Sequence, residues 1–329
     1  MQILEHVQRW TRACALALVA MAALNGAQAQ DKPVLNIIVP YPAGGPSDTS
    51  ARRLAPELSK QLGQTVIVQN IGGAGGAIAA QKVLQSSPDG LTLMYASPNE
   101  VILVPAINPN AKYKSQDFTP IGFATQTPMM VVARTSLPVN NIDELIQYGK
   151  STGRELTYGS VGAGSFQHIL GTYLASQTKL NMIHVPYKGG APLNNDILGQ
   201  QVDLMVTSMS AVHNFVEAGK MHALGMMTKE RSPLMPGIPT VNEGRSLKGM
   251  DFWLWAGLVA PANTPLAVQE RLNKAFNQVI ILQSVRDGIA ASGGEPQPPM
   301  GLQELRKLYQ SDAKRYPNLV KALNIRIEN

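Results

Sequence analysis

The sequence predicts an α/β fold with two lobes, each a mostly parallel sheet flanked by helices. Short apolar runs alternate with amphipathic stretches along most of the 329-residue chain, which is typical of strand–helix–strand units. Several runs are apolar throughout, as expected of strands that are buried on both faces. The last segment, 265–329, has helical spacing and no comparable strands, so we expect it to pack against a sheet formed earlier in the chain.

The spacing of apolar residues gives the expected elements. We expect the first helix to start at Ser47 or Asp48 and to stop at Gly63, with a kink at Pro56, which removes one helical hydrogen bond. The expected helices cover 47–62, 142–146, 169–174 and 272–280, and the expected strands cover 35–39, 66–69, 91–95, 129–133, 156–158, 182–185, 204–206, 223–227 and 253–259.

The chain is expected to cross between the lobes twice, near 126–129 and near 251–255, and to hinge there. This division places 30–126 and 253–329 in lobe 1 and 127–252 in lobe 2. Both ends of the folded chain therefore belong to the first lobe.

Residues 1–29 are predicted to be a secretory signal. Arg9 and Arg12 precede an apolar stretch that is too short to span a bilayer, and a small-x-small motif ends at Ala29. We expect cleavage after Ala29, although an amphipathic or buried N-terminal helix is the alternative. The single cysteine, Cys14, lies inside this leader, so the mature chain is expected to have no disulfide, no thiol chemistry and no lipid anchor.

Composition narrows the classes of partner. The formal net charge is +6, but the basic residues are scattered and few aromatic residues lie among them, so nucleic-acid binding has little support. A mild positive excess favours small acidic molecules. No later apolar run approaches the length of a membrane span, and we expect no membrane insertion after signal cleavage.

The stretch from Tyr41 to Thr49 is the strongest local signal for a binding site. An apolar strand enters a turn in which Gly44 and Gly45 can expose consecutive backbone N–H groups, and a helix follows. Free amides at the positive end of a helix dipole form an anion site. The alternative is an ordinary strand–turn–helix connection in which Ser47 and Asp48 cap the helix.

A second glycine-rich loop enters a helix at 158–165. Ser160, Ser165 and the intervening amides could hold a carboxylate, and His168 lies in the first helical turn, as a ligand contact or as a satisfied helix-start histidine. A nucleophilic serine is the sharper alternative, but neither serine lies in a G-x-S-x-G motif.

Three other features give weaker evidence for a binding site. The glycines at 72–76 fail the dinucleotide pattern because Ile78 stands where the third glycine would be, so close packing beside the first loop is favoured, with a direct ligand contact by Gly75 as a further option. Lys188 either adds a positive charge at the cleft lip or is an ordinary surface lysine. The histidines have no metal-ligand spacing, and we expect neither a metal nor a cofactor.

Several motifs then occur in order through nearly the whole mature chain. They are Ile-Val-Pro-Tyr-Pro-Ala-Gly-Gly-Pro-Ser-Asp at 38–48, Gly-Ala-Gly-Gly at 73–76, Tyr-Gly-Ser-Val-Gly-Ala-Gly-Ser-Phe-Gln-His at 158–168, His-Val-Pro-Tyr-Lys-Gly at 184–189 and Gly-Gln-Gln-Val-Asp-Leu-Met at 199–205. With these motifs the chain resembles the Bug family, the TctC-type periplasmic receptors of tripartite tricarboxylate transporters. The match continues through 231–243 and 255–265.

The resemblance implies the type II, Venus-flytrap fold of periplasmic binding proteins, with a small carboxylate held between the lobes. The ligand would be a dicarboxylate, an aromatic carboxylate or a carboxylate-bearing amino acid. The resemblance also implies a periplasmic, non-enzymatic receptor that delivers its ligand to membrane permease subunits, and we expect a monomer. The family's two binding loops map onto 43–48 and 160–165.

Two stretches depart from the family pattern. The family usually reads Glu-Asn-Arg-Pro-Gly-Ala-Gly-Gly-Asn-Ile-Gly where 69–79 read Gln-Asn-Ile-Gly-Gly-Ala-Gly-Gly-Ala-Ile-Ala. The loop after the third strand, often Gly-Thr-x-x-x-His-x-x-Asn in the family, reads Ala-Ser-Pro-Asn-Glu-Val at 96–101. If Glu100 faces the cleft, it would repel a second carboxylate or pair with an amine, which would disfavour a ligand such as citrate.

Two alternative functions would use the same cleft: that of a sensing component that signals to a membrane kinase, and that of a serine-dependent hydrolase. We assign no catalytic residue. The expected ligand-binding residues are Tyr41, Ala43, Gly44, Gly45, Ser47, Asp48, Gly75, Ser97, Asn99, Ser160, Gly162, Ala163, Gly164, Ser165, His168, Lys188 and Ser208.

Overall fold

A computed structural model describes residues 33–325, and the predicted leader lies outside the described residues. The strands are β1 (Leu35–Val39), β2 (Val66–Asn70), β3 (Thr92–Ala96), β4 (Phe118–Ala133), β5 (Leu156–Ser160), β6 (Met182–Pro186), β7 (Leu204–Ser208), β8 (His222–Met226), β9 (Trp253–Pro261) and β10 (Glu295–Pro296). The α-helices are α2 (Pro46–Leu62), α3 (Ala77–Leu84), α4 (Val104–Ile107), α5 (Ile142–Thr152), α6 (Phe166–Thr178), α7 (Gly190–Leu198), α8 (Met209–Glu217), α9 (Leu266–Ile280), α10 (Gln283–Ala290) and α11 (Leu302–Ala322).

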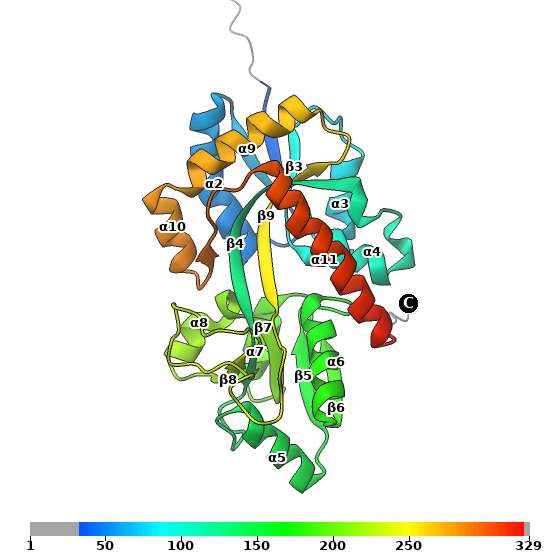
Figure 1. Cartoon of the computed structure of the whole chain (residues 1–329), viewed down its shortest axis with the longest axis vertical. Helices are drawn as coiled ribbons and strands as arrows, with labels where there is room; N and C mark the ends of the chain where they lie inside the picture. Colours follow the sequence, from blue (N-terminus) through cyan, green and yellow to red (C-terminus); the bar gives the residue numbers. More distant parts are fainter. Residues whose placement is uncertain (1–32, 326–329) are drawn as a thin grey trace, which may run out of the picture. The chain divides into compact units, whose positions relative to one another are not determined.

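The strands form two sheets that share β4 (Figure 1). Hydrogen-bonded neighbours follow the order β2-β1-β3-β9-β4-β7-β5-β6, and β8 and β10 also pair with β4. Strands β1, β2 and β3 are parallel to one another along this path, as are β5, β6 and β7, whereas β9 is antiparallel to both β3 and β4. We call the sheet containing β1–β3 and its helices lobe 1, and the sheet containing β5–β8 and its helices lobe 2.

Strand β4 passes from one sheet into the other and changes partners between Pro128 and Met129. Its residues up to Pro128 pair with β9, and those from Met129 pair with β7 and β8. The returning chain meets it at the same level, because Met129 N–H donates to the Phe252 carbonyl (3.0 Å) and Phe252 N–H donates to the Met227 carbonyl (2.7 Å). Two chain segments therefore join the lobes side by side.

Alternate residues of the first sheet face two separate cores, since successive side chains of a strand point to opposite faces. Ile37 packs with residues of α2 and α9, and its neighbour Ile38 packs with residues of α3 and α11. The C-terminal segment thus packs against a sheet built earlier, as predicted, and it covers both faces of that sheet. Its short strand β10 pairs with β4. Figure 1 shows α11 descending beside β9 towards lobe 2.

Helix α2 begins one or two residues earlier than predicted, because Pro46 occupies its first turn and Gly45 is the N-cap without any side-chain cap bond. Proline suits this position, since its missing N–H would have no helical partner there. Neither Ser47 nor Asp48 is the N-cap, so the alternative reading in which these two residues cap the helix is wrong. The helix continues through Pro56, whose ring is exposed, and ends at Gly63 with a left-handed φ of 63°.

Strand β4 is sixteen residues long, although its apolar pattern predicted only 129–133. The earlier part of the strand contains Pro120, Gly122 and Pro128. Because proline and glycine are unfavourable inside strands, this part was not predicted as a strand. Tertiary pairing with β9 outweighs these local preferences.

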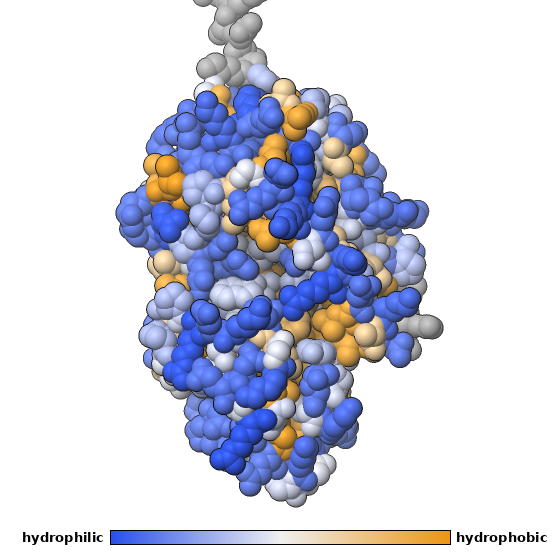
Figure 2. All heavy atoms as spheres, viewed as in Figure 1, coloured by the Kyte–Doolittle hydropathy of each residue, from blue (hydrophilic) through white to orange (hydrophobic). Residues whose placement is uncertain are grey.

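The surface is mixed in character. On the face shown in Figure 2 hydrophobic patches are separate and lie within a mainly hydrophilic surface. Among the described residues, no helix combines the length and the apolar character needed to cross a bilayer.

Candidate ligand-binding site

The first loop lies between β1 and α2 and is held from within by Asp48. The buried Asp48 carboxylate accepts hydrogen bonds from Gly44 N–H, Arg52 Nε and Asn70 Nδ2, each at 2.9 Å. Burial raises the pKa of Asp48, but these hydrogen bonds outweigh it and leave the pKa below its ordinary value. Asp48 is therefore occupied by the protein itself, and so is the Gly44 N–H that was expected to be free.

The loop tip is nevertheless open. Ala43 and Gly44 are exposed, and Gly45 and Ser47 are half-buried. Gly44 has φ +86°, and a Cβ there would meet no atom within 4 Å, so its conformation rather than crowding favours glycine. Pro46 has no N–H to offer. The donors that remain at the start of α2 are the Gly45, Ser47 and Asp48 amides and the Ser47 hydroxyl.

Glu100 forms the floor beneath this loop and does not face a cleft. Its side chain is wholly buried; one carboxylate oxygen accepts from the Tyr41 hydroxyl, and the other accepts from Ser97 N–H (2.7 Å) and Ser97 Oγ (3.0 Å). Burial raises the pKa of Glu100, and burial together with the adjacent Glu100 raises the pKa of Tyr41 well above its ordinary value. The expected repulsion of a second ligand carboxylate by Glu100 therefore has no support in this geometry.

The glycine run beside the loop serves close packing, as the failed dinucleotide pattern suggested. A Cβ on Gly76, which has φ +94°, would lie 2.4 Å from Glu100 Cγ. Gly75 is exposed. Glu100 can be buried under the loop because Gly76 leaves room for it.

The second loop joins β5 to α6 and is tied together by hydroxyls. Ser165 is the N-cap of α6; its Oγ accepts from His168 N–H (3.3 Å) and donates to the Gly162 carbonyl (2.7 Å). Gly162 and Gly164 have positive φ angles of 143° and 78°. Gly164 lies in the buried part of the loop and Ala163 is exposed at its tip.

Two stacked imidazoles support this loop. The rings of His168 and His184 lie 3.8 Å apart at 12°. Gly164 N–H donates to His168 Nδ1 (3.0 Å), so in the neutral ring the proton sits on Nε2. Burial lowers the pKa of each histidine to about 4, and for His184 the neighbouring His168 adds to the effect. Both rings are therefore neutral at pH 7, and His168 retains one N–H donor.

Ser160 lies within reach of a histidine but is enclosed. Its Oγ is 2.7 Å from His184 Nε2, donates to the Gly162 carbonyl (2.9 Å) and accepts from Gly162 N–H (3.2 Å). The residue is fully buried, and in the described part of the chain no carboxylate hydrogen-bonds to His184. This arrangement holds a loop in place and leaves no exposed nucleophile.

The two loops are connected through the turn that follows β3. Tyr41 and Ser97 both donate to the carboxylate of Glu100. Asn99, which immediately precedes Glu100, accepts at Oδ1 from Phe166 N–H (2.7 Å). Phe166 is the first residue of α6. A continuous set of contacts therefore runs from Tyr41 in lobe 1 to the start of α6 in lobe 2.

Two expected site residues stand apart from this network. Lys188 is exposed. The residue before it, Tyr187, donates its N–H to the Ser160 carbonyl (3.0 Å). Ser208 is buried at the end of β7, where its Oγ lies 3.2 Å from Ser210 Oγ. No hydrogen bond in the described residues links Ser208 to either loop.

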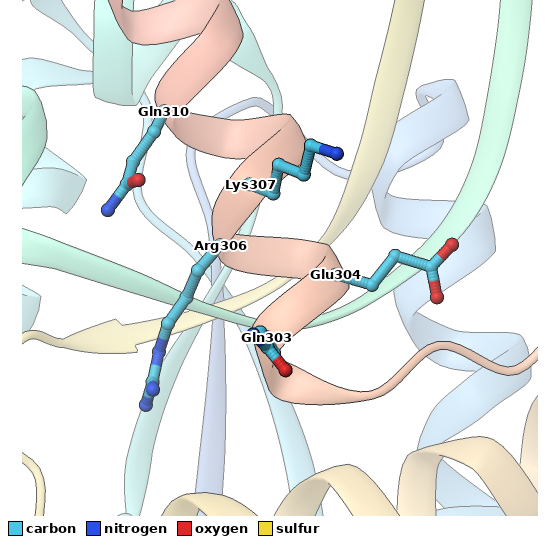
Figure 3. Close-up of a pocket in the computed structure, with 5 residues that line it drawn as sticks. All are labelled: Gln303, Glu304, Arg306, Lys307 and Gln310. Atoms are coloured by element: carbon cyan, nitrogen blue, oxygen red, sulfur yellow. The ribbon is translucent and has the colours of Figure 1, made fainter.

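Sequence reasoning missed His184, Asn70 and Phe166 as parts of the site. His184 and Asn70 lie at or near the carboxyl ends of strands in parallel pairs, where ligands of α/β sheets bind, and that position was the available signal. A pocket elsewhere is lined by five side chains of α11 alone, Gln303, Glu304, Arg306, Lys307 and Gln310 (Figure 3). It shares no residue with the loops.

Comparison with known proteins identifies the family. Residues 50–325 match the tripartite tricarboxylate transporter family receptor, TctC. The chain belongs to this family. A curated relative from Agrobacterium vitis, the UPF0065 protein in the TAR-I ttuE-ttuC' intergenic region, is 36% identical over 275 residues, which are 82% of this chain and 79% of the relative.

Solved structures of TctC-type and Bug proteins share the fold. The periplasmic binding protein BugD has a TM-score of 0.81 at 32% identity and covers 90% of this chain and 99% of its own. Rhodopseudomonas palustris Rpa4515 with adipate scores 0.82 at 27% identity, covering 91% and 99%, and MatC from the same organism with bound malate scores 0.79 at 29% identity, covering 87% and 98%. These likenesses confirm the predicted Bug-family resemblance and the two-lobed binding-protein fold.

Proposed function

We propose that this TctC-family protein is a periplasmic solute receptor that holds a small carboxylate between its two loops and delivers it to a tripartite transporter in the membrane. The observation that carries the proposal is the set of contacts from Tyr41 through Glu100, Ser97 and Asn99 to Phe166, which ties the loop before α2 to the start of α6. Amides at two helix starts suit an anion.

The chemistry of the donors supports a carboxylate ligand. The second loop offers the backbone amide of Ala163, an exposed residue at its tip, and His168 offers a neutral N–H. Relatives of the same fold hold adipate and malate, both small dicarboxylates. Since no free buried cation lies in the described loops, we infer that charge is balanced by helix dipoles and oriented amides rather than by an ion pair.

We also propose the division of the chain that this mechanism needs. Lobe 1 comprises 30–126 and 253–329, lobe 2 comprises 127–252, and residues 1–29 are a leader removed after Ala29. Closure about the two adjacent chain segments at Met129 and Phe252 would bury the ligand and shift the open–closed population. The receptor acts as a monomer in this proposal.

Binding rather than catalysis is the function that the site supports. The contact between Ser160 Oγ and His184 Nε2 is the one observation that favours a hydrolase. It is outweighed by the complete burial of Ser160 and by the two further hydrogen bonds that hold its hydroxyl.

A charge placed at the tip of the second loop tests the proposal. Ala163→Asp adds a carboxylate where the ligand carboxylate should lie, and Ala163→Asn adds a neutral side chain of the same shape; Ala163 is exposed, so both should fold. Calorimetric titration with adipate, malate and their amides should show carboxylate binding that weakens about ten-fold in Ala163→Asp at low salt. Equal affinities for the two variants, or preference for the amides, would contradict the proposal.

A further inference from the structure

The start of helix α6 is capped by a side chain from the other lobe. The first N–H groups of a helix have no partner within it. Ser165 Oγ satisfies the amide of His168, and Asn99 Oδ1 satisfies the amide of Phe166 at 2.7 Å. Asn99 lies 67 residues earlier in the chain, as the first residue of the short π-helix Asn99–Leu103 that follows β3.

The hydrogen bond between Asn99 and Phe166 is shielded from water. Asn99 is 5% exposed and Phe166 is not exposed at all. The Phe166 ring packs against Tyr316 of α11 (4.8 Å between centroids) and against Phe252 of the returning segment (6.3 Å). Breaking the bond without separating the lobes would leave a buried donor unsatisfied, which is unfavourable.

Asn99 is itself fixed to the first loop. Its N–H donates to Ser97 Oγ (3.3 Å), and Ser97 is bound by Glu100, which also binds Tyr41. The side chain therefore reaches α6 from a position set by the loop that precedes α2.

We propose that Asn99 is a positioning residue that fastens the start of α6 to lobe 1 and favours the closed arrangement before the ligand arrives. The amide carbonyl of Asn99 takes the place at the Phe166 N–H that a carboxylate oxygen would otherwise take. The ligand is then left with the amides of the loop tip ahead of Ser165. This inference rests on the proposed function for its effect on affinity, but the effect on lobe spacing does not require a ligand.

Two substitutions separate the acceptor from the shape of the side chain. Asn99→Leu keeps the volume and removes the acceptor, and Asn99→Asp keeps an acceptor that the helix dipole favours. Asn141→Leu is the matched control, because Asn141 caps α5 within lobe 2 through Glu144 N–H (2.9 Å) and its side-chain amide donates to Glu144 as well (2.8 Å).

Lobe spacing can be measured with spin labels on the processed protein. Cys14 is the only cysteine of the sequence and lies in the predicted leader, so labels attach only to introduced cysteines at Lys60→Cys on α2 and Lys150→Cys on α5, both exposed. Double electron–electron resonance without ligand should give longer distances in Asn99→Leu than in the wild type. Asn99→Asp and Asn141→Leu should keep the wild-type distribution.

The same variants predict ligand kinetics, with adipate and malate as probes. Dissociation should be roughly ten-fold faster in Asn99→Leu, from the lost buried hydrogen bond, and unchanged in Asn141→Leu. Identical distance distributions in wild type and Asn99→Leu would overturn the inference, as would opening in Asn99→Asp. If no carboxylate binds the wild type, the proposed function fails, and the ligand-free distances still decide the role of Asn99.

Discussion

At the scale of single residues, Asp48 does most to fix the first loop. It accepts three hydrogen bonds at 2.9 Å while being almost fully buried, so it sets the conformation of Gly44 and joins α2 to β2 through Asn70. The sequence predicted an open glycine loop, and the loop is open at Ala43 and Gly44. The sequence could not reveal that the Asp48 side chain points into the protein, because its partner Asn70 is 22 residues away and burial is a property of the fold.

Asp48→Ala should reduce the free energy of unfolding by about 2 kcal/mol at pH 7, since it leaves buried donors without partners. The pKa of Asp48 is lowered in the folded state, so its contribution is present above the ordinary pKa of 3.8 and is lost as the pH falls through the folded value. Urea denaturation from pH 3 to pH 7 would check this, with the exposed Asp89→Ala as control. A loss at pH 7 no larger than that of the control would contradict the role given to Asp48.

The same limit explains the other residue-level errors. The sequence leaves open whether Glu100 faces the cleft, and only the packing shows that Gly76 leaves space for its side chain beneath the loop. Ser160 and His184 are adjacent because β5 and β6 pair in parallel register, with Tyr158 opposite His184. Register between strands is set by the fold and is not readable from either strand alone.

At the scale of elements, α11 connects lobe 1 to the segment that returns from lobe 2. Asp312 accepts from Trp255 Nε1 on β9 (2.9 Å), and Tyr316 Oη donates to the Trp253 carbonyl (3.3 Å). Arg315 Nη2 donates to the Asp251 carbonyl (2.8 Å) and lies over the Phe252 ring. The expectation that 265–329 is mainly helical covers this helix but not its bounds, and its contacts at the crossing join side chains about 60 residues apart in the sequence.

Asp312→Asn should remove a pH-dependent loss of stability. Burial raises the pKa of Asp312 to about 6, so the folded state keeps a proton that the unfolded state releases, and stability falls as the pH rises from about 4 to about 6. The variant keeps an acceptor for Trp255 and should be more stable than the wild type at pH 7 by up to about 3 kcal/mol.

The two histidines predict the opposite dependence of stability on pH in the same pH range. This dependence should be measurable in the Asp312→Asn variant, because the contribution of Asp312 is then removed. Folded pKa values of about 4 for His168 and His184 mean that the unfolded state binds more protons between pH 4 and pH 6.5, so stability rises with pH there. Melting temperatures of wild type and variant across pH 4–7 would test both signs. A variant that tracks the wild type throughout would contradict the assignment to Asp312.

At the scale of the whole molecule, the alternation of strands and helices predicted the α/β class and the ordered motifs predicted the family. The two glycine loops also appeared in the sequence, because glycine, proline and a following helix are local signals. That a ligand would lie between the loops followed from the family resemblance, whereas the contact between Asn99 and Phe166, which joins residues 67 positions apart, could not be read from the sequence. Local signals could therefore predict the two loops but not the hydrogen bonds that connect them.

The central claim is that one small carboxylate contacts both loops at once. Glycine-selective ¹⁵N NMR of the receptor, titrated with the carboxylate that binds best among adipate, malate and related acids, tests it most directly. Gly45, Gly162 and Gly164 should shift together with a single dissociation constant, while Gly153 and Gly249, which lie in other turns, should not move. Shifts confined to one loop, or to glycines outside both, would contradict the account.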